Sequence, residues 1–189
     1  MTHAAEAPAG GLALPELRLK PREGRRLSAG HLWVFSNEVD TARTPLDGFE
    51  PGALCRVIGD REHFLGYAYV NPHALICARI LGRDARYPPG KPLLVHRLQV
   101  ALALRARLYA RPFYRLAHGE SDGLPGLVLD RYGDVVVGQI GTAGMEALKA
   151  EIAAAVQQVV APAALVCKND SGARELEGLP SYVETAFGD

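Results

Sequence analysis

The stretch ALCRVIGDREHFLGYAYVNPHALICARIL, residues 53–81, decides the fold of the first half of the chain. It contains three runs rich in apolar, aromatic and β-branched residues, at 53–58, 64–70 and 74–81. A Gly-Asp pair and an Asn-Pro pair separate the runs, and both pairs are turn signals. Short strands that follow one another through tight turns predict a small barrel or a strongly curled sheet.

The residues before this stretch predict further parts of the same unit. Residues 16–20 alternate charged side chains with leucines, which indicates a short half-buried strand. Residues 22–29 predict one or two helical turns ended by a glycine, and Trp33 opens an extended segment. We therefore expect one domain over residues 15–85. Residues 1–14 are rich in Ala, Pro and Gly, and we expect a disordered tail there.

A second unit is expected to follow a connection. Prolines and a glycine are concentrated after Asp84, and we place a linker at residues 86–92. Residues 93–110 predict a helix without a break. Its arginines lie within one arc, and we expect their charged heads to extend into solvent. The second domain is expected over residues 93–189.

The rest of this second domain mixes strands and a helix. A β-hairpin is predicted over 127–140, followed by a helix for which Thr142 is available as a cap. A short strand is expected at 165–167 and a loop at 175–180. The β-type run at 182–185 finds no turn partner, so the chain looks cut rather than finished.

Composition excludes several classes of protein. The chain has 189 residues, of which 48% are hydrophobic, enough for a substantial core. No apolar run reaches the roughly 18 residues of a membrane helix, and the N-terminus lacks signal-peptide order. Cys55, Cys77 and Cys167 are widely spaced and form no C-x-x-C pair. We therefore expect buried core cysteines in a cytoplasmic protein, with no disulfide framework, no metal site and no membrane contact.

The net charge of zero hides a strongly basic central block. Residues 1–78 carry 8 basic and 9 acidic side chains, residues 79–115 carry 9 and 1, and residues 116–189 carry 4 and 11. Seventeen of the 21 cations are arginines, which bind phosphate through two nitrogens and stack on bases. Local basic density of this kind favours nucleic-acid binding. The alternative is a GC-rich genome that encodes arginine throughout.

The cluster His118, Glu120, Ser121 and Asp122 invites a catalytic interpretation. A zinc deaminase would also need a P-C-x-x-C motif, which the chain lacks. A serine nucleophile would need the G-x-S-x-G elbow, which G-E-S-D-G does not match. Phosphate-binding glycine loops are missing as well. We therefore expect a polar loop in which Ser121 or Asp122 bonds local backbone, and we assign no catalytic residue.

Cations and an aromatic ring gather instead near the helix–strand junction. Phosphate contacts need cations, and unpaired bases stack on flat rings. The candidate RNA-contacting residues are Lys20, Arg22, Arg25, Arg26, His31, Trp33 and Arg79. Two alternatives stay open, because Trp33 could belong to the barrel core and the arginines to a solvated face.

Residues 19–39 and residues 64–81 resemble the PUA domain of bacterial ribosomal RNA large-subunit methyltransferases of the cytosine-5 methyltransferase I type. LKPREGRRLSAGHLWVFSNEV, residues 19–39, is similar to the opening L-K-x-G-R-x-x-x-L-x-x-G-H-P-W-[VI]-F-S of that domain. It departs from the pattern at Leu32, where the family has Pro, and at Glu23. FLGYAYVNPHALICARIL, residues 64–81, is similar to F-[LI]-G-x-G-x-[YV]-N-P-x-S-x-I-x-x-R-x-L.

The most specific match is GESDGLPGLVLDRYGD, residues 119–134, which resembles the motif E-S-D-G-L-P-G-L-x-x-D-x-[YF]-G-D of the family's central domain. KNDSGARELEGL, residues 168–179, looks like the segment that closes that domain. The resemblance implies a structural or interdomain role for one set of residues. The set comprises Glu120, Ser121, Asp122, Gly123, Pro125, Gly126 and Asp130.

The resemblance, which covers about residues 15–180, implies an α+β fold: a PUA-type β pseudo-barrel followed by a small α+β domain. It also implies ribosomal RNA as partner and S-adenosylmethionine as cofactor of a full-length enzyme that methylates cytosine C5. In the family, a further Rossmann-like domain binds that cofactor and supplies a catalytic Cys, which adds to C6 of the ring. Its motifs are missing here, so we expect no cofactor in this chain. A homodimer, a stand-alone RNA-binding adaptor and a scaffold whose acidic half docks a protein are also considered.

Overall fold

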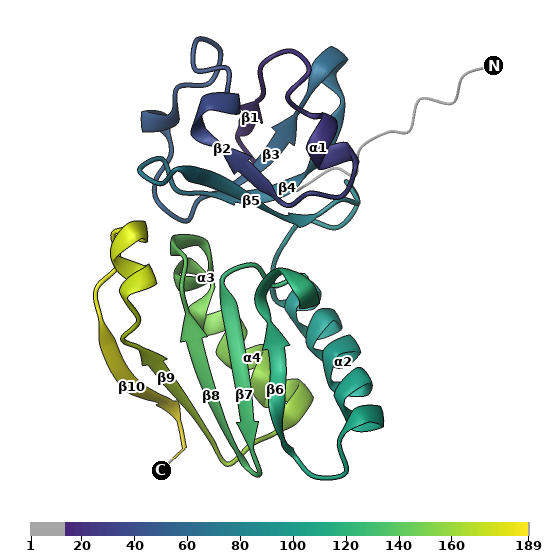
Figure 1. Ribbon diagram of the computed structural model, residues 1–189, viewed down its shortest axis with the longest axis vertical. Coiled ribbons are helices and arrows are strands. Elements are labelled where there is room, and N and C mark those ends of the chain that lie inside the picture. The colour runs from purple at the N-terminus through teal and green to yellow at the C-terminus, as the bar shows by residue number, and fades with distance from the viewer. Residues whose placement is uncertain (1–13, 189) are drawn as a thin grey trace, which may run out of the picture.

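The computed structural model describes residues 14–188 and shows two units, one above the other in Figure 1. Each unit contains one five-stranded sheet, and helices accompany both sheets. The expected α+β class is therefore confirmed. The tail predicted at residues 1–14 lies almost wholly outside the described residues.

The first sheet is mixed, with strand order β1-β3-β4-β5-β2. Its elements are β1 (Glu16–Arg18), α1 (Arg25–Ser28), β2 (Trp33–Phe35), β3 (Leu54–Ile58), β4 (Phe64–Val70) and β5 (Ile76–Gly82). β1 runs parallel to β3, and the other neighbours are antiparallel. The three predicted runs of residues 53–81 thus form consecutive strands, as the turn signals between them indicated.

The core of this unit contains two of the cysteines. Cys55 and Cys77 are fully buried among apolar side chains that include Val34 and Val57. Burial disfavours the charged thiolate, so it raises the pKa of Cys77 to about 12 and raises that of Cys55 as well. Cys167 is buried in the second unit. The predicted core role of the three cysteines is confirmed.

The second sheet has the order β10-β9-β8-β7-β6. Its unit consists of α2 (Lys91–Leu108), β6 (Phe113–His118), β7 (Leu127–Tyr132), β8 (Val135–Ile140), α3 (Ala143–Ala147), α4 (Lys149–Val160), β9 (Ala164–Asn169) and β10 (Tyr182–Phe187). β8 and β9 are parallel, and α3 and α4 form the crossover between them. α2 packs on α4, and apolar side chains of both helices join those of the sheet in one core (Figure 1).

Several details of this unit differ from the predictions. α2 begins at Lys91, inside the predicted linker. The helix expected after Thr142 is divided into α3 and α4. The Thr142 hydroxyl makes no capping bond and instead accepts a hydrogen bond from Tyr69 of the first unit. Residues 182–185, for which the sequence showed no turn partner, belong to β10, which pairs antiparallel with β9. That pairing spans a long connection, so no tight turn signals it in the sequence.

The arginines of α2 also differ from expectation. Arg97 donates to the carbonyl of Leu81, and Arg105 binds the carboxylate of Asp122 through two nitrogens at 2.6 and 2.7 Å. Only Arg107 of these helical arginines is exposed. The predicted outward extension is wrong for Arg97 and Arg105, because neighbouring segments supply oxygen acceptors on that face of the helix.

Candidate nucleic-acid interface

Five of the candidate RNA-contacting residues lie exposed on and around α1. They are Lys20, Arg22, Arg25, Arg26 and His31. Arg25 and Arg26 open the helix, and Arg22 lies in the preceding turn with a φ of 73°. Such a φ is uncommon for a residue with a side chain. The N–H of Arg22 donates to the Asp60 carboxylate at 3.0 Å, which stabilises the turn.

Two of these cations already bind oxygen atoms of the protein. Arg26 Nη2 lies 2.6 Å from Glu38 Oε1, and its guanidinium lies 5.1 Å from the centre of the Phe35 ring. Lys20 Nζ donates to the carbonyl of Asn37 at 2.8 Å. Both contacts hold a long side chain in place on an exposed surface. A ligand that contacts these side chains therefore pays a smaller entropic cost for immobilising them.

Arg22 and Arg25 are the cations best available to a ligand. Both are exposed, and neither guanidinium forms an ion pair within the part of the chain that the structure describes. A guanidinium without a carboxylate partner can bind a phosphate through two nitrogens. These two residues are therefore the centre of the candidate interface.

Trp33 and Arg79 lie elsewhere, at the seam between the two units. They are paired across β2 and β5, and Trp33 is half-buried. Trp33 Nε1 donates to Glu120 Oε1 at 2.8 Å, and the His31 ring meets the indole edge-on at 5.9 Å. These two residues therefore belong to the seam, and the ring of His31 connects them with the exposed surface around α1.

Glu177 is the shared acceptor at the other side of this seam. Its Oε1 lies 2.8 Å from Arg79 Nη1, with side-chain exposed fractions of 5% and 12%. Asn71 Nδ2 donates to Oε2 at 2.8 Å, and the N–H of Ala143 donates to the same oxygen at 3.3 Å. The sequence does not reveal this role, because Asn71 belongs to a turn signal and Glu177 to a predicted loop.

Tyr69 adds a buried contact between the units. Its hydroxyl donates to the carbonyl of Pro125 at 2.9 Å and lies 3.1 Å from Thr142 Oγ1. Gly144 lies against the ring, where a Cβ would overlap it. Burial raises the pKa of the Tyr69 hydroxyl, so it stays a protonated donor. Tyr69 is a second residue whose role the sequence did not reveal.

The motif at residues 119–134 begins at this seam, with a turn that is bonded to other elements of the second unit. Residues 119–122 form a 3-10 turn, in which Ser121 is exposed. Asp122 accepts from the N–H of His118 at 2.8 Å, besides its pair with Arg105. The predicted bond from Asp122 to local backbone is confirmed. The turn is therefore held to α2 and to β6 at once.

Four glycines of the motif have positive φ, among them Gly123 at 69° and Gly126 at 81°. The side chain of Arg97 fills the space beside Gly123, and that of Thr142 fills the space beside Gly126, so no Cβ fits at either position. Asp130, further along, pairs with Arg115 at 2.9 Å on the sheet surface. Only part of the motif therefore lies at the seam.

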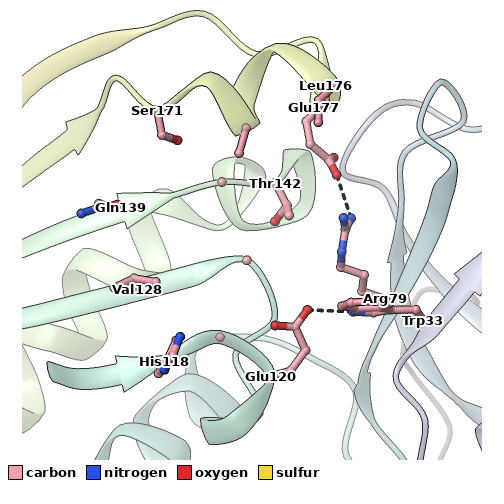
Figure 2. A pocket seen from close by; sticks show the side chains of 14 residues that line it. Trp33, Arg79, His118, Glu120, Val128, Gln139, Thr142, Ser171, Leu176 and Glu177 are labelled. Atoms are coloured by element: carbon pink, nitrogen blue, oxygen red, sulfur yellow. Dashed lines mark hydrogen bonds and ion pairs between the residues drawn. The ribbon is translucent and has the colours of Figure 1, made fainter.

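A cavity of about 520 Å³ lies within the seam (Figure 2). Figure 2 shows Trp33 and Arg79 extending from the first unit toward Glu120 and Glu177 of the second. Two carboxylates therefore line this cavity, and the charge there does not favour a phosphate group. The exposed cations around α1 are the better candidates for contact with a polyanion.

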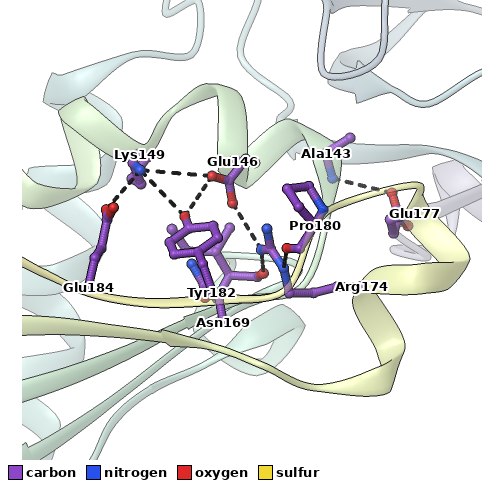
Figure 3. A network of polar contacts seen from close by, with 10 residues as sticks. Ala143, Glu146, Lys149, Asn169, Arg174, Glu177, Pro180, Tyr182 and Glu184 are labelled. Atoms are coloured by element: carbon purple, nitrogen blue, oxygen red, sulfur yellow. Dashed lines mark hydrogen bonds and ion pairs between the residues drawn. The ribbon is translucent and has the colours of Figure 1, made fainter.

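A buried polar network positions the segment that carries Glu177 (Figure 3). Arg174 is 1% exposed, and it donates to the carbonyl of Pro180 at 2.8 Å and to Glu146 Oε2 at 2.9 Å. Tyr182 donates to the other oxygen of Glu146 at 2.7 Å. The 3-10 helix Gly172–Glu177 is thus anchored to α3 and β10, which holds Glu177 at the seam.

Two further features are absent from residues 14–188. None of their helices combines the length and apolarity required to cross a membrane. No group of three or more His, Cys, Asp or Glu side chains among them is placed to hold a metal ion.

Comparison with protein families matches residues 17–83 to the PUA-like domain. The curated relatives include the ribosomal RNA large subunit methyltransferase I of Erwinia tasmaniensis, 35% identical over 179 residues, and that of Aliivibrio fischeri, 31% identical over 169 residues. These alignments cover 92% and 87% of this chain, and 44% and 42% of the relatives. The chain therefore spans less than half the length of these relatives.

Solved structures agree with the fold over nearly the whole chain. A candidate SAM-dependent methyltransferase from Streptococcus mutans aligns with a TM-score of 0.73 at 17% identity, over 93% of this chain and 44% of that one. A candidate methyltransferase in complex with SAH aligns with a TM-score of 0.74 at 17% identity, over 93% of this chain and 43% of that one. At this identity, the likeness shows the shared fold.

Proposed function

We propose that this chain is the RNA-recognition part of a ribosomal RNA large subunit methyltransferase. One observation carries the proposal: residues 17–83 match the PUA-like domain, and the exposed cations around α1 lie within that match. The similarity of 31–35% to relatives named as such methyltransferases supports the choice of ribosomal RNA over other polyanions.

The two units have different tasks in this proposal. The first, a PUA-type pseudo-barrel over about residues 15–85, contacts RNA phosphates through Arg22 and Arg25, with Lys20, Arg26 and His31 around them. The second unit, over about residues 93–189, carries the interdomain motif of residues 119–134. Contacts such as Trp33 with Glu120 support a fixed orientation between the units.

The chemistry of the whole protein is also part of the proposal. We assign to it transfer of a methyl group from S-adenosylmethionine to cytosine C5 of large-subunit ribosomal RNA, in the cytoplasm. No residue of this chain receives a catalytic role, and we propose that the chain itself holds no cofactor. A homodimer stays a prediction from the sequence.

The salt dependence of RNA binding tests the interface. For single strands, the slope of log K against log salt falls by about 0.7 for each phosphate that the protein no longer neutralises. The double variant Arg22→Gln, Arg25→Gln should therefore flatten the slope by about 1.4 with a ribosomal RNA fragment, measured by fluorescence anisotropy. Arg26 is left intact, because its removal would leave the carboxylate of Glu38 unpaired.

A matched control removes the same charge elsewhere. Arg107 and Arg111 are exposed in the second unit, so the variant Arg107→Gln, Arg111→Gln has the same net charge as the first variant. Its slope should stay close to that of the unchanged chain. Equal slopes for both double variants would refute a specific interface around α1.

A further inference from the structure

A second cavity, of about 700 Å³, is lined by none of the exposed cations around α1. Its walls come from the end of β5, from the connection that follows and from the first turns of α2. No sequence motif pointed to this place. Its size suits one nucleotide or a similarly small ligand.

Two arginines of this cavity have no carboxylate partner among the described residues. Arg83 donates to the carbonyls of Leu65 and His31, at 3.3 and 2.7 Å. Arg97 donates to the carbonyl of Leu81. Burial lowers the pKa of both guanidinium groups, and no carboxylate in the described part of the chain opposes that shift. Both side chains therefore bring positive charge that the surrounding residues leave uncompensated.

The acidic residue in the wall, Asp84, is already engaged. It binds Arg86 through both carboxylate oxygens, at 3.0 and 2.7 Å. The N-terminus of α2 adds further positive potential, because its first turn contains no acidic residue and Gly90 gives it no side-chain cap. Lys91 opens the helix. The balance of charge at this cavity thus favours an anion.

The cavity also offers a flat ring and apolar surface. Tyr87 is 64% exposed, and Leu93 and Pro92 line the wall with it. One hydrogen bond holds the loop that carries Tyr87 to the first sheet: the hydroxyl of Tyr67 donates to the carbonyl of Ala85 at 2.7 Å. Rings in such positions stack on unpaired bases with little regard to sequence.

We propose that this cavity binds one unpaired nucleotide of an RNA strand, with the base on Tyr87 and the phosphate near Arg83 and Arg97. The inference rests on the proposed function, and it names a second contact beyond the α1 interface. Arg83 connects the two places, since it donates to the main chain of His31, a residue of that interface. One strand can therefore pass from the exposed cations to the cavity.

Anisotropy with a labelled oligouridine strand and with an RNA duplex of the same length tests this proposal. Removal of one base stack weakens single-strand binding between about fivefold and a hundredfold. Tyr87→Ala should show a decrease in that range for the single strand and little change for the duplex, whose bases are paired. Tyr87→Phe, which keeps the ring, should bind as the unchanged chain does.

A second variant narrows the cavity and leaves the ring in place. A Cβ at Gly82 would lie 3.9 Å from the carbonyl oxygen of Tyr87 and 4.0 Å from Leu93 Cδ2, which are ordinary contacts. The backbone at Gly82 therefore accepts the Cβ of Gly82→Val, and the single-strand affinity of this variant should fall as that of Tyr87→Ala does. Tyr132→Ala is the matched control, because Tyr132 is exposed to a similar degree, at 55%, in the second unit.

The outcomes separate the two proposals. If the unchanged chain binds neither RNA, the proposed function and this inference both fail. If it binds RNA but Tyr87→Ala and Gly82→Val bind the single strand as tightly as Tyr132→Ala does, only the cavity is refuted. Equal decreases in affinity for strand and duplex would also refute it, because a duplex offers no unpaired base.

Discussion

Breaking the ion pair between Arg79 and Glu177 should lower the stability of the protein, because the pair lies buried at the seam between the units. Arg79→Met keeps much of the side-chain volume and removes the charge. It leaves the Glu177 carboxylate, 5% exposed, with two neutral N–H donors only, from Asn71 and Ala143. Unpairing a buried charge costs about 3–5 kcal/mol. The Arg79 side chain is 12% exposed, and its Nη1 contact lacks hydrogen-bond geometry. We therefore expect a loss of stability at the lower end of that range, about 3 kcal/mol.

Urea unfolding followed by tryptophan fluorescence measures this cost. Trp33 is the chain's single tryptophan and lies at the same seam, so its emission reports directly on the seam. The free energy of unfolding, extrapolated to water, should fall by about 3 kcal/mol in Arg79→Met, a large share of the roughly 5–15 kcal/mol usual for a domain.

A double-mutant cycle shows whether the unpaired charge is the cause. Glu177→Gln removes the carboxylate and retains a carbonyl oxygen for Asn71 and Ala143. In the double variant with Arg79→Met, no buried charge is left at this position, so part of the missing stability should return. A cost below about 1 kcal/mol for Arg79→Met, or additive costs in the double variant, would refute the reasoning.

Two further predictions concern packing and titration. Gly144→Ala places a methyl group on the ring of Tyr69, so we expect a destabilisation of about 1–3 kcal/mol in a thermal unfolding measurement; an unchanged melting temperature would contradict that packing. The pKa of Asp84 is lowered to about 2, first by the Arg86 side chain, so its pairing favours folding above about pH 4 and fades as the pH falls through 2. In an NMR titration, Arg86→Gln should return this pKa toward 3.8, and no change would refute the pairing.

The strands of the first sheet were predictable because their evidence is local. Residues 53–81 alternate short apolar runs with turn pairs, and β3, β4 and β5 follow that pattern. The burial of Cys55 and Cys77 follows from the same alternation. The pairing of β10 with β9 was not predictable, because a long connection with its own 3-10 helix separates them.

The contacts at the seam could not be predicted from the sequence. Trp33 stands beside cations in the sequence, which favoured a role in base stacking, yet its hydrogen-bond partner Glu120 lies 87 positions further along. Glu177 lies 106 positions from Asn71. Contacts of this kind depend on how the two units meet, which no periodicity within either unit encodes. The exposure of Arg22 and Arg25, by contrast, agrees with their charge alone.

The contacts at the seam also bear on how the chain could be divided. The covalent connection between β5 and α2 is short and exposed, and Tyr69, Asn71 and Arg79 bind the second unit independently of it. A cut in that connection would sever one peptide bond and none of these contacts. The two halves could therefore be produced as separate polypeptides that reassociate, with the seam acting as their recognition surface.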